Sequence, residues 1–193
     1  MKRLFIALNF PRDIVVKLTE LQSGLRGARW VPPQNLHLTL SYIGEASNIL
    51  LEDLEDMLSS LAAHAFCMKL RGINNFTSKG RSKSIWVGVE EEPSLFSLHS
   101  KIKNCLQKNR IPRDKRQFSP HVTLARLKNV CPEDTAGFIA FNNLFKTRSF
   151  PIESFTLFES ISKKEGSIYL PLKSFDLLDA FTVNRLTDCL QIL

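Results

Sequence analysis

Two short motifs in the sequence carry histidine and threonine at the same spacing, His37-Leu38-Thr39-Leu40 and His121-Val122-Thr123-Leu124. On a β-strand, alternate side chains share a face, so each histidine would point with its threonine and away from the aliphatic residues. One neutral imidazole can take a proton from an attacking water while a second, protonated imidazole gives one to a leaving oxygen. The hydroxyls can donate hydrogen bonds to phosphate oxygens. The paired motifs therefore predict phosphoester chemistry.

The other histidines, His64 and His99, have no threonine two residues later, and we interpret them as structural. A zinc site made of two histidines and a cysteine is an alternative, but the sequence lacks local ligand spacing for it. The cysteines are widely scattered, as is typical of reduced thiols in a cytoplasmic protein: Cys67, Cys105, Cys131 and Cys189. Neither a glycine-rich nucleotide loop nor a His-Glu-x-x-His motif is present, so we expect no cofactor and no metal.

The positive charge of the chain is concentrated in two stretches. The chain has 26 Lys and Arg residues against 19 Asp and Glu, a net charge of +7. Residues 69–83 hold five basic residues and no acid, and residues 110–128 hold six basic residues and one acid. The second stretch contains one of the His-x-Thr motifs. A polyanionic partner is therefore expected beside this second motif, with residues 69–83 as a further candidate surface for holding it.

The hydrophobic pattern alternates between strands and helices, without the long apolar runs of a parallel sheet. Strands are expected over 4–10, 36–42, 66–76, 84–89, 122–127, 150–158 and 167–175, and helices over 14–25, 50–61, 93–106 and 132–145. The pattern predicts an α+β protein with antiparallel sheets. The two motifs lie 84 residues apart, which suggests a duplicated unit with two lobes facing across a cleft. We assign residues 1–175 to one bilobal domain and 176–193 to a C-terminal tail or short helix.

Several longer segments contain or accompany these motifs: Arg3–Asn9, Trp30–Gly44, Ile85–Glu90 and Phe118–Arg126. Together they resemble the 2H phosphoesterase superfamily and, within it, the RNA 2′,3′-cyclic phosphodiesterases formerly called 2′-5′ RNA ligases. The resemblance extends from Arg3 to about Phe175. It implies two antiparallel sheets that face each other across a basic central cleft, with helices on the outside.

The resemblance also implies a reaction. Its substrate would be RNA with a terminal 2′,3′-cyclic phosphate, tRNA fragments for example, opened by water to a 2′-phosphate. Such a catalyst would also join a cyclic-phosphate end to a 5′-hydroxyl reversibly and without ATP, in a 2′-5′ ligation. His37 would be the general acid that protonates the ribose 3′ oxygen, and His121 the general base that activates water. Thr39, Thr123 and Arg126 would bind the phosphate.

The position of Arg126 conflicts with a regular strand. It follows His121 by five residues, an odd offset that places the two side chains on opposite faces. For Arg126 to reach the phosphate, either the strand ends or bulges near Ala125, or the Arg126 side chain reaches round the edge of the strand.

Two other functions fit the same residues. One alternative is an RNA-end-binding protein without turnover. The other is a 2H enzyme that acts on another small cyclic or 2′-5′ phosphodiester. The intact His-x-Thr pairs argue against the first, since binding alone needs lysine and arginine but not two imidazoles. The N-terminal apolar stretch is short and ends at Pro11, so we interpret it as a strand and expect a cytoplasmic monomer with no membrane association.

Overall fold

Ten β-strands and four α-helices succeed one another along the part of the chain that the computed structural model describes, residues 1–112, 116–163 and 166–179. The strands are β1 (Lys2–Leu8), β2 (Ala28–Trp30), β3 (Leu38–Ala46), β4 (Phe66–Met68), β5 (Leu70–Ser78), β6 (Arg81–Val89), β7 (His121–Leu127), β8 (Phe150–Ile152), β9 (Ser154–Lys163) and β10 (Gly166–Asp176). The helices are α1 (Arg12–Glu20), α2 (Asn48–Ser59), α3 (Pro93–Lys108) and α4 (Pro132–Asn142), and a 3₁₀ turn, η1, covers Pro33–Asn35.

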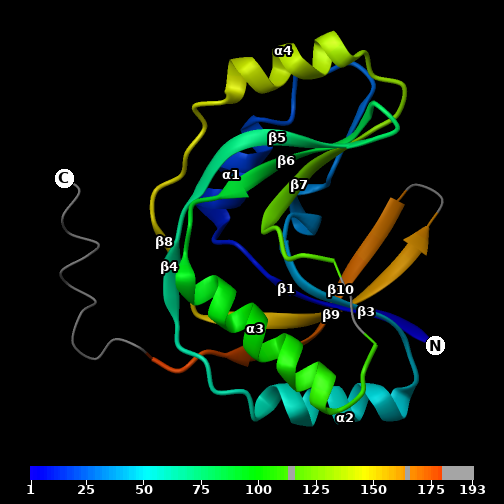
Figure 1. Ribbon diagram of the computed structural model, residues 1–193, viewed down its shortest axis with the longest axis vertical. Coiled ribbons are helices and arrows are strands. Elements are labelled where there is room, and N and C mark those ends of the chain that lie inside the picture. The colour runs from blue at the N-terminus through cyan, green and yellow to red at the C-terminus, as the bar shows by residue number, and fades with distance from the viewer. Residues whose placement is uncertain (113–115, 164–165, 180–193) are drawn as a thin grey trace.

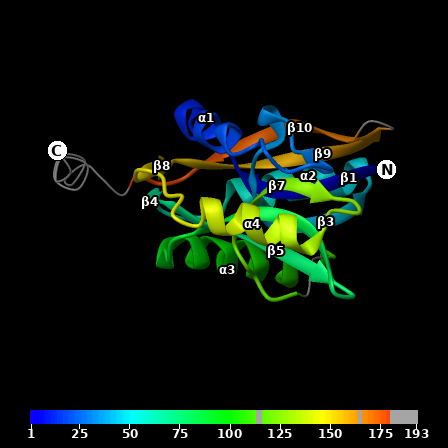
Figure 2. The same cartoon turned by 90° about the horizontal axis from the view of Figure 1, so that it is seen from above.

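Most of the strands form one antiparallel sheet in the order β10-β9-β1-β3-β7-β6-β5, with β2 paired to β7, while β4 and β8 pair separately. Helices α2 and α3 lie at one end of the molecule and α4 at the other (Figure 1), and α1 lies on the side opposite α3 (Figure 2). The helices thus surround the sheet, and the predicted α+β class is confirmed. None of the described helices is long and apolar enough to cross a bilayer.

The large sheet consists of two halves that meet at a single residue pair. Strand β3 from the β10-β9-β1-β3 half pairs with β7 from the other half only through Leu38 and Val122. Because both strands are antiparallel and begin close to this pair, they overlap at their first residues and then run apart. The two sheets implied by the resemblance are therefore the halves of one hydrogen-bonded path.

Helices α2 and α3 each begin at a residue whose side chain satisfies a free N–H group of the first turn. The Ser47 side chain accepts a hydrogen bond from the Leu50 N–H at 3.2 Å, and the Glu92 carboxylate accepts one from the Ser94 N–H at 3.0 Å. Each helix then buries a stripe of apolar side chains, which in α3 is Leu95, Leu98, Ile102 and Leu106. These stripes join the inward face of the sheet in one hydrophobic core that extends through both halves.

Some element boundaries differ from the predicted ones because pairing partners change. The strand expected over 66–76 divides at Lys69, since β4 pairs with β8 and β5 pairs with β6. The strand expected over 150–158 divides at Glu153 for the same reason. The helix expected over 14–25 ends at Glu20, before Gly24, whose φ of +76° an α-helix does not allow.

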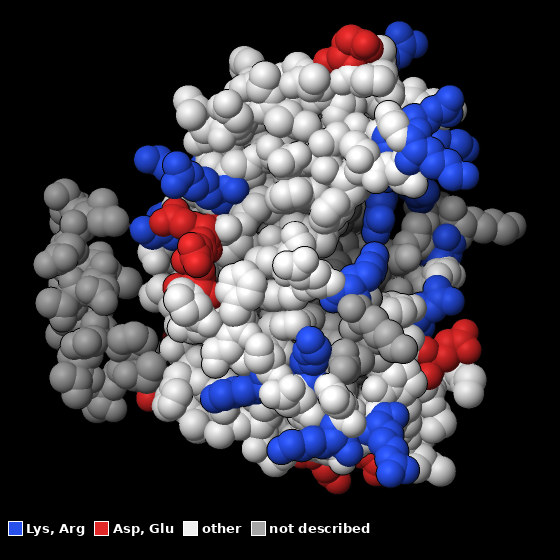
Figure 3. All heavy atoms as spheres, in the orientation of Figure 1, with Lys and Arg blue, Asp and Glu red and all other residues white. Residues whose placement is uncertain are grey.

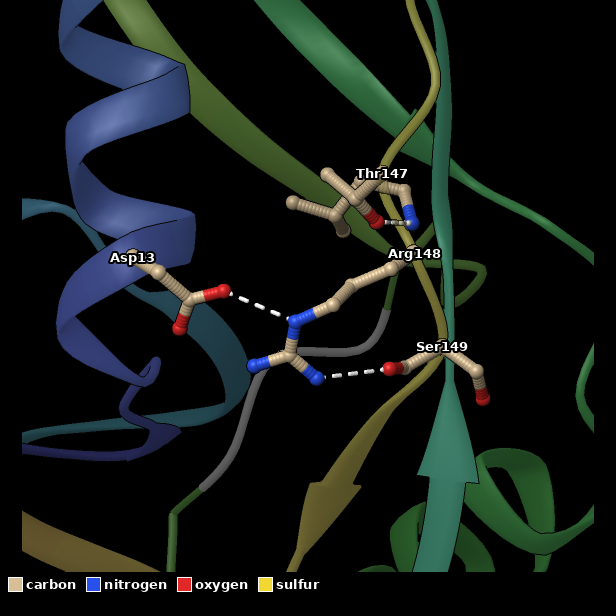
Figure 4. A network of polar contacts seen from close by, with 5 residues as sticks. Asp13, Thr147, Arg148 and Ser149 are labelled. Atoms are coloured by element: carbon tan, nitrogen blue, oxygen red, sulfur yellow. Dashed lines mark hydrogen bonds and ion pairs between the residues drawn. The ribbon is translucent and has the colours of Figure 1, made fainter. Parts of the chain in front are cut away.

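Contacts from the loop before β8 connect distant parts of the chain (Figure 4). Arg148 Nε donates to Asp13 Oδ2 of α1 at 2.8 Å, and this bond holds the pKa of the Asp13 carboxyl below its usual range. Both side chains are about half exposed, so the pair orients α1 more than it stabilises the fold. The adjacent Thr147 is buried, and its Oγ1 accepts the Leu70 N–H at 3.0 Å.

Replacing Thr147 with valine is expected to lower the free energy of unfolding by about 1–3 kcal/mol, because the buried Leu70 N–H would lose its acceptor. The change is close to isosteric, so the lost hydrogen bond dominates, and urea unfolding followed by circular dichroism measures it. Thr77→Val, at an exposed position of β5, is the matched control, with an expected change within about 0.5 kcal/mol. Equal stability of the two variants would contradict the assigned role of the Thr147 hydroxyl.

The described chain stays attached to the body beyond β10. The Leu177 N–H donates to the Glu153 carbonyl at 2.8 Å, and the Leu178 N–H donates to the Ala63 carbonyl at 2.7 Å. The tail predicted from residue 176 therefore begins with residues that pack on the fold. Residues 180–193, where a short helix or loose tail is predicted, lie outside the described residues.

Candidate active site

The two His-x-Thr motifs meet where the halves of the sheet join. Leu38 and Val122 pair directly across the junction and are both fully buried. Side chains on a strand alternate in direction, so the histidine and threonine on either side of each buried residue project from the opposite face. In this antiparallel register His37 is aligned with Thr123, and Thr39 with His121. An approximate two-fold axis through the Leu38–Val122 pair thus relates the two motifs, which face the same space.

Each imidazole is oriented by a backbone carbonyl two residues earlier in the chain. His37 Nδ1 lies 2.6 Å from the Asn35 carbonyl oxygen, and His121 Nδ1 lies 2.7 Å from the Ser119 carbonyl oxygen. A carbonyl only accepts hydrogen bonds, so Nδ1 carries the proton in both rings, and Nε2 is the atom available for proton transfer. His37 Nε2 also lies 3.1 Å from Thr39 Oγ1. Both motifs therefore fix the ring through Nδ1 and leave Nε2 for proton transfer.

The surroundings favour the neutral form of both imidazoles. Burial lowers the pKa of His37, the Asn35 carbonyl opposes that change, and the positive charges of His121 and Arg126 lower the pKa further. Burial likewise lowers the pKa of His121, against its carbonyl partner, and Arg126 and Arg116 add to the effect. Arg126 acts on both rings, so its charge lies close to the junction. An anion bound there would offset this charge and favour protonation of one ring.

Aromatic side chains from neighbouring strands enclose each imidazole. The rings of Phe5 and Tyr169 lie 5.1 and 5.0 Å from the His37 ring. The rings of Phe76 and Trp86 lie 4.8 and 5.8 Å from the His121 ring. Phe5 and Tyr169 belong to a small apolar cluster separate from the main core, on the site face of the sheet. These rings supply the burial that lowers both pKa values.

A bulge in β7 turns Arg126 toward the site. Trp86 of β6 pairs with Thr123 and Ser84 pairs with Arg126, with a register shift between Ile85 and Trp86. Ser84 and Trp86 are two residues apart on one strand and share a face, so Thr123 and Arg126 also share a face. The extra residue leaves Leu124 and Ala125 both fully buried. The predicted irregularity near Ala125 is thus present, and Arg126 lies on the histidine face.

The structure separates the predicted site residues from other candidates. It brings together His37, Thr39, His121, Thr123 and Arg126 on one face at the junction. His99 lies elsewhere, on α3, where its ring stacks on Phe118 at 3.9 Å. His64 is exposed, next to the end of the described chain. Within the described ranges no three His, Cys, Asp or Glu side chains are grouped as metal ligands would be.

Sequence reasoning missed the four aromatic rings and the two carbonyls. The rings come from β1, β5, β6 and β10, and their contacts with the imidazoles depend on strand order and register, which no local pattern specifies. The carbonyls belong to the segments that lead into β3 and β7, and any residue type supplies that group. A signal was available for two rings, since Phe5 and Trp86 lie within Arg3–Asn9 and Ile85–Glu90, two of the segments that carry the family resemblance.

Comparison with proteins of known sequence finds related chains of similar length. An RNA 2′,3′-cyclic phosphodiesterase of Archaeoglobus fulgidus is 31% identical over 177 residues, which cover 90% of this chain and 99% of the relative. A protein of the same name from Thermus thermophilus is 32% identical over 187 residues, covering 91% and 90%. Matches that cover about nine-tenths of this chain span the positions of both His-x-Thr motifs.

Solved structures share the fold. TT0787 of Thermus thermophilus superposes with a TM-score of 0.77 at 29% identity and covers 93% of this chain and 100% of its own. Escherichia coli LigT complexed with 3′-AMP superposes with a TM-score of 0.75 at 23% identity, over 92% and 98% of the two chains. The family model of the 2′-5′ RNA ligase superfamily matches residues 10–163, in agreement with the expected resemblance. The chain belongs to the 2′-5′ RNA ligase superfamily.

Proposed function

We propose that the protein hydrolyses the 2′,3′-cyclic phosphate at an RNA end to a 2′-phosphate, with His37 and His121 as acid and base. The observation that carries the proposal is the junction, where two imidazoles face one space and each is held by a carbonyl at Nδ1. The name shared by the Archaeoglobus and Thermus relatives supports the substrate class. A binding protein would need neither ring held in this way.

In the proposed reaction, His121 Nε2 takes a proton from water as the water oxygen bonds to phosphorus. The bond between phosphorus and the ribose 3′ oxygen breaks, and His37 Nε2 gives its proton to that oxygen. The products are a 2′-phosphate and a free 3′-hydroxyl, and a proton has moved from His37 to the product and from water to His121. Thr39, Thr123 and Arg126 bind the non-bridging oxygens, where negative charge is greatest in the transition state.

With a 5′-hydroxyl in place of water as the nucleophile, the same steps form a 2′-5′ phosphodiester without ATP, with His121 again as the base and His37 as the acid, so the proposal includes 2′-5′ joining. The exposed basic residues of the β5–β6 hairpin, Lys79, Arg81 and Lys83, would hold the RNA strand in this proposal. Figure 3 shows lysine and arginine side chains in and around a recess between this hairpin and the β9–β10 hairpin.

The test is hydrolysis of 2′,3′-cyclic AMP and of a short RNA with a cyclic-phosphate end, in EDTA and without ATP. Phosphorus NMR of the product is expected to show a 2′-phosphate. A 3′-phosphate product would overturn the role of the 3′ oxygen as leaving group. Binding of the cyclic-phosphate RNA without any turnover would replace the proposed enzyme with an RNA-end-binding protein.

A further inference from the structure

Arg29 lies directly opposite Arg126 at the edge of the junction. The two residues are partners in the antiparallel pairing of β2 with β7, so their side chains project from the same face of the sheet. Both are exposed. Directly opposed residues have Cβ atoms about 4.5–5.5 Å apart, and like charges in such a pair are destabilising. This arrangement therefore suits a site where anions bind beside both side chains.

The Arg29 guanidinium also reaches the other half of the sheet. A Cβ atom on Gly166, the first residue of β10, would lie 3.1 Å from Arg29 Nη2, so the glycine leaves room for the guanidinium. Lys2, Arg148 and Lys173 each form an ion pair with a carboxylate. Among the described residues no carboxylate pairs with Arg29. The charge of the Arg29 guanidinium is thus available to a ligand that binds between β2 and the β9–β10 hairpin.

Arg126 shares the histidine face of β7, whereas the Arg29 guanidinium lies beside Gly166 of β10. The charge of Arg126 lowers the pKa of both His37 and His121, whereas Arg29 is not among the charges that shift either pKa. A phosphate between the imidazoles would therefore be within reach of Arg126, and Arg29 would lie beyond it. In an RNA chain the next anion beyond a terminal cyclic phosphate is the internucleotide phosphate that precedes the terminal nucleoside.

We propose that Arg29 binds this internucleotide phosphate, so that the protein acts on cyclic-phosphate ends of oligonucleotides in preference to mononucleotides. The identity of the ligand rests on the proposed function. The planar guanidinium can hold a phosphodiester through two parallel N–H donors. Arg29 is thus a specificity-determining residue, while Arg126 binds the reacting phosphate.

The experiment compares two substrates that differ by one charge. Both are ApA with a terminal 2′,3′-cyclic phosphate, one with a phosphodiester linkage and one with a neutral methylphosphonate linkage. Wild type is expected to prefer the charged substrate about tenfold in kcat/KM, and Arg29→Ala is expected to lose that preference with little change on the neutral one. Arg26→Ala removes an exposed charge three residues earlier and is expected to retain the preference.

Salt dependence and product binding provide readouts that a purely structural role would not change. The slope of log kcat/KM against log salt for the charged substrate should be shallower by about 0.7 in Arg29→Ala. Equal loss on both substrates, or no loss on either, would overturn the proposal for Arg29 and leave the proposed function intact. If wild type hydrolyses neither substrate, the proposed function fails. Binding of the two corresponding 2′-phosphate dinucleotides, with and without Arg29, then decides the assignment of Arg29 by itself.

Discussion

Replacing His37 or His121 with alanine is expected to lower kcat/KM for 2′,3′-cyclic AMP by about 10²–10⁴-fold, because each change removes one proton-transfer group from the junction. The two groups act in one step, so the double variant should lose much less than the product of the two single losses. Steady-state hydrolysis of the three variants measures both effects, with circular dichroism to confirm that each is folded.

His64→Ala is the matched control for these variants. His64 is exposed and far along the chain from both motifs, so its replacement should change kcat/KM less than about twofold. Wild-type activity in either His37→Ala or His121→Ala would contradict paired histidine catalysis. A large loss in His64→Ala would show that the junction does not contain the whole machinery.

A sulfur leaving group distinguishes the acid from the base. A thiol with a pKa near 8.5 leaves as a thiolate without protonation, whereas an alkoxide needs a proton. On a cyclic substrate with sulfur in place of the 3′ oxygen, His37→Ala should recover most of the wild-type rate, and His121→Ala should not. Recovery by His121→Ala instead would exchange the two assigned roles.

Replacing Arg126 with glutamine is expected to lower kcat/KM by about 10- to 100-fold and to move the pH profile to higher pH. The loss follows from one charge-assisted hydrogen bond to phosphate, worth about 1.5–3 kcal/mol. The shift follows because Arg126 lowers the pKa of both His37 and His121, so its removal raises both values. In a bell-shaped profile both limbs report these groups, and both should move in the same direction.

Profiles of kcat/KM from about pH 5 to about pH 9 test this expectation. Arg29→Gln is the control for the position of the limbs, since Arg29 is not among the charges that shift either imidazole pKa. A loss of activity with unmoved limbs would show that the Arg126 charge does not face the imidazoles in solution. Moved limbs with full activity would remove Arg126 from the phosphate contacts.

Local patterns predicted the parts of the site that depend on a single strand. The alternation in 36–42 and 122–127 places each histidine on the face of its threonine, and the register at Leu38 and Val122 agrees with it. The odd offset of Arg126, taken with the phosphate role that the resemblance implies, leaves an irregularity near Ala125 as one of two explanations, and the register shift in the pairing of β6 with β7 selects it.

Features that depend on pairing between distant segments were not predictable in the same way. The division at Lys69 occurs because β4 and β5 have different partners, and nothing in the residues themselves marks the change. Strand β2 is three residues long, which is too short for an alternating pattern to be recognised. It forms because β3 diverges from β7 after Val122 and leaves the edge of β7 free to pair with β2. Arg29 was missed with it, since only that pairing brings it beside Arg126.

The junction also bears on regiochemistry. Its two halves present nearly equivalent imidazoles, each fixed through Nδ1, to a ligand whose 2′ and 3′ ester oxygens are themselves chemically similar. Neither the acid nor the base can therefore tell these oxygens apart by its own chemistry. For the proposed substrate, the aromatic side chains around the two imidazoles therefore have to determine which ester bond breaks. These side chains differ, since Phe5 and Tyr169 lie beside the His37 ring and Phe76 and Trp86 lie beside the His121 ring. The orientation in which the ribose is admitted would then fix the product isomer.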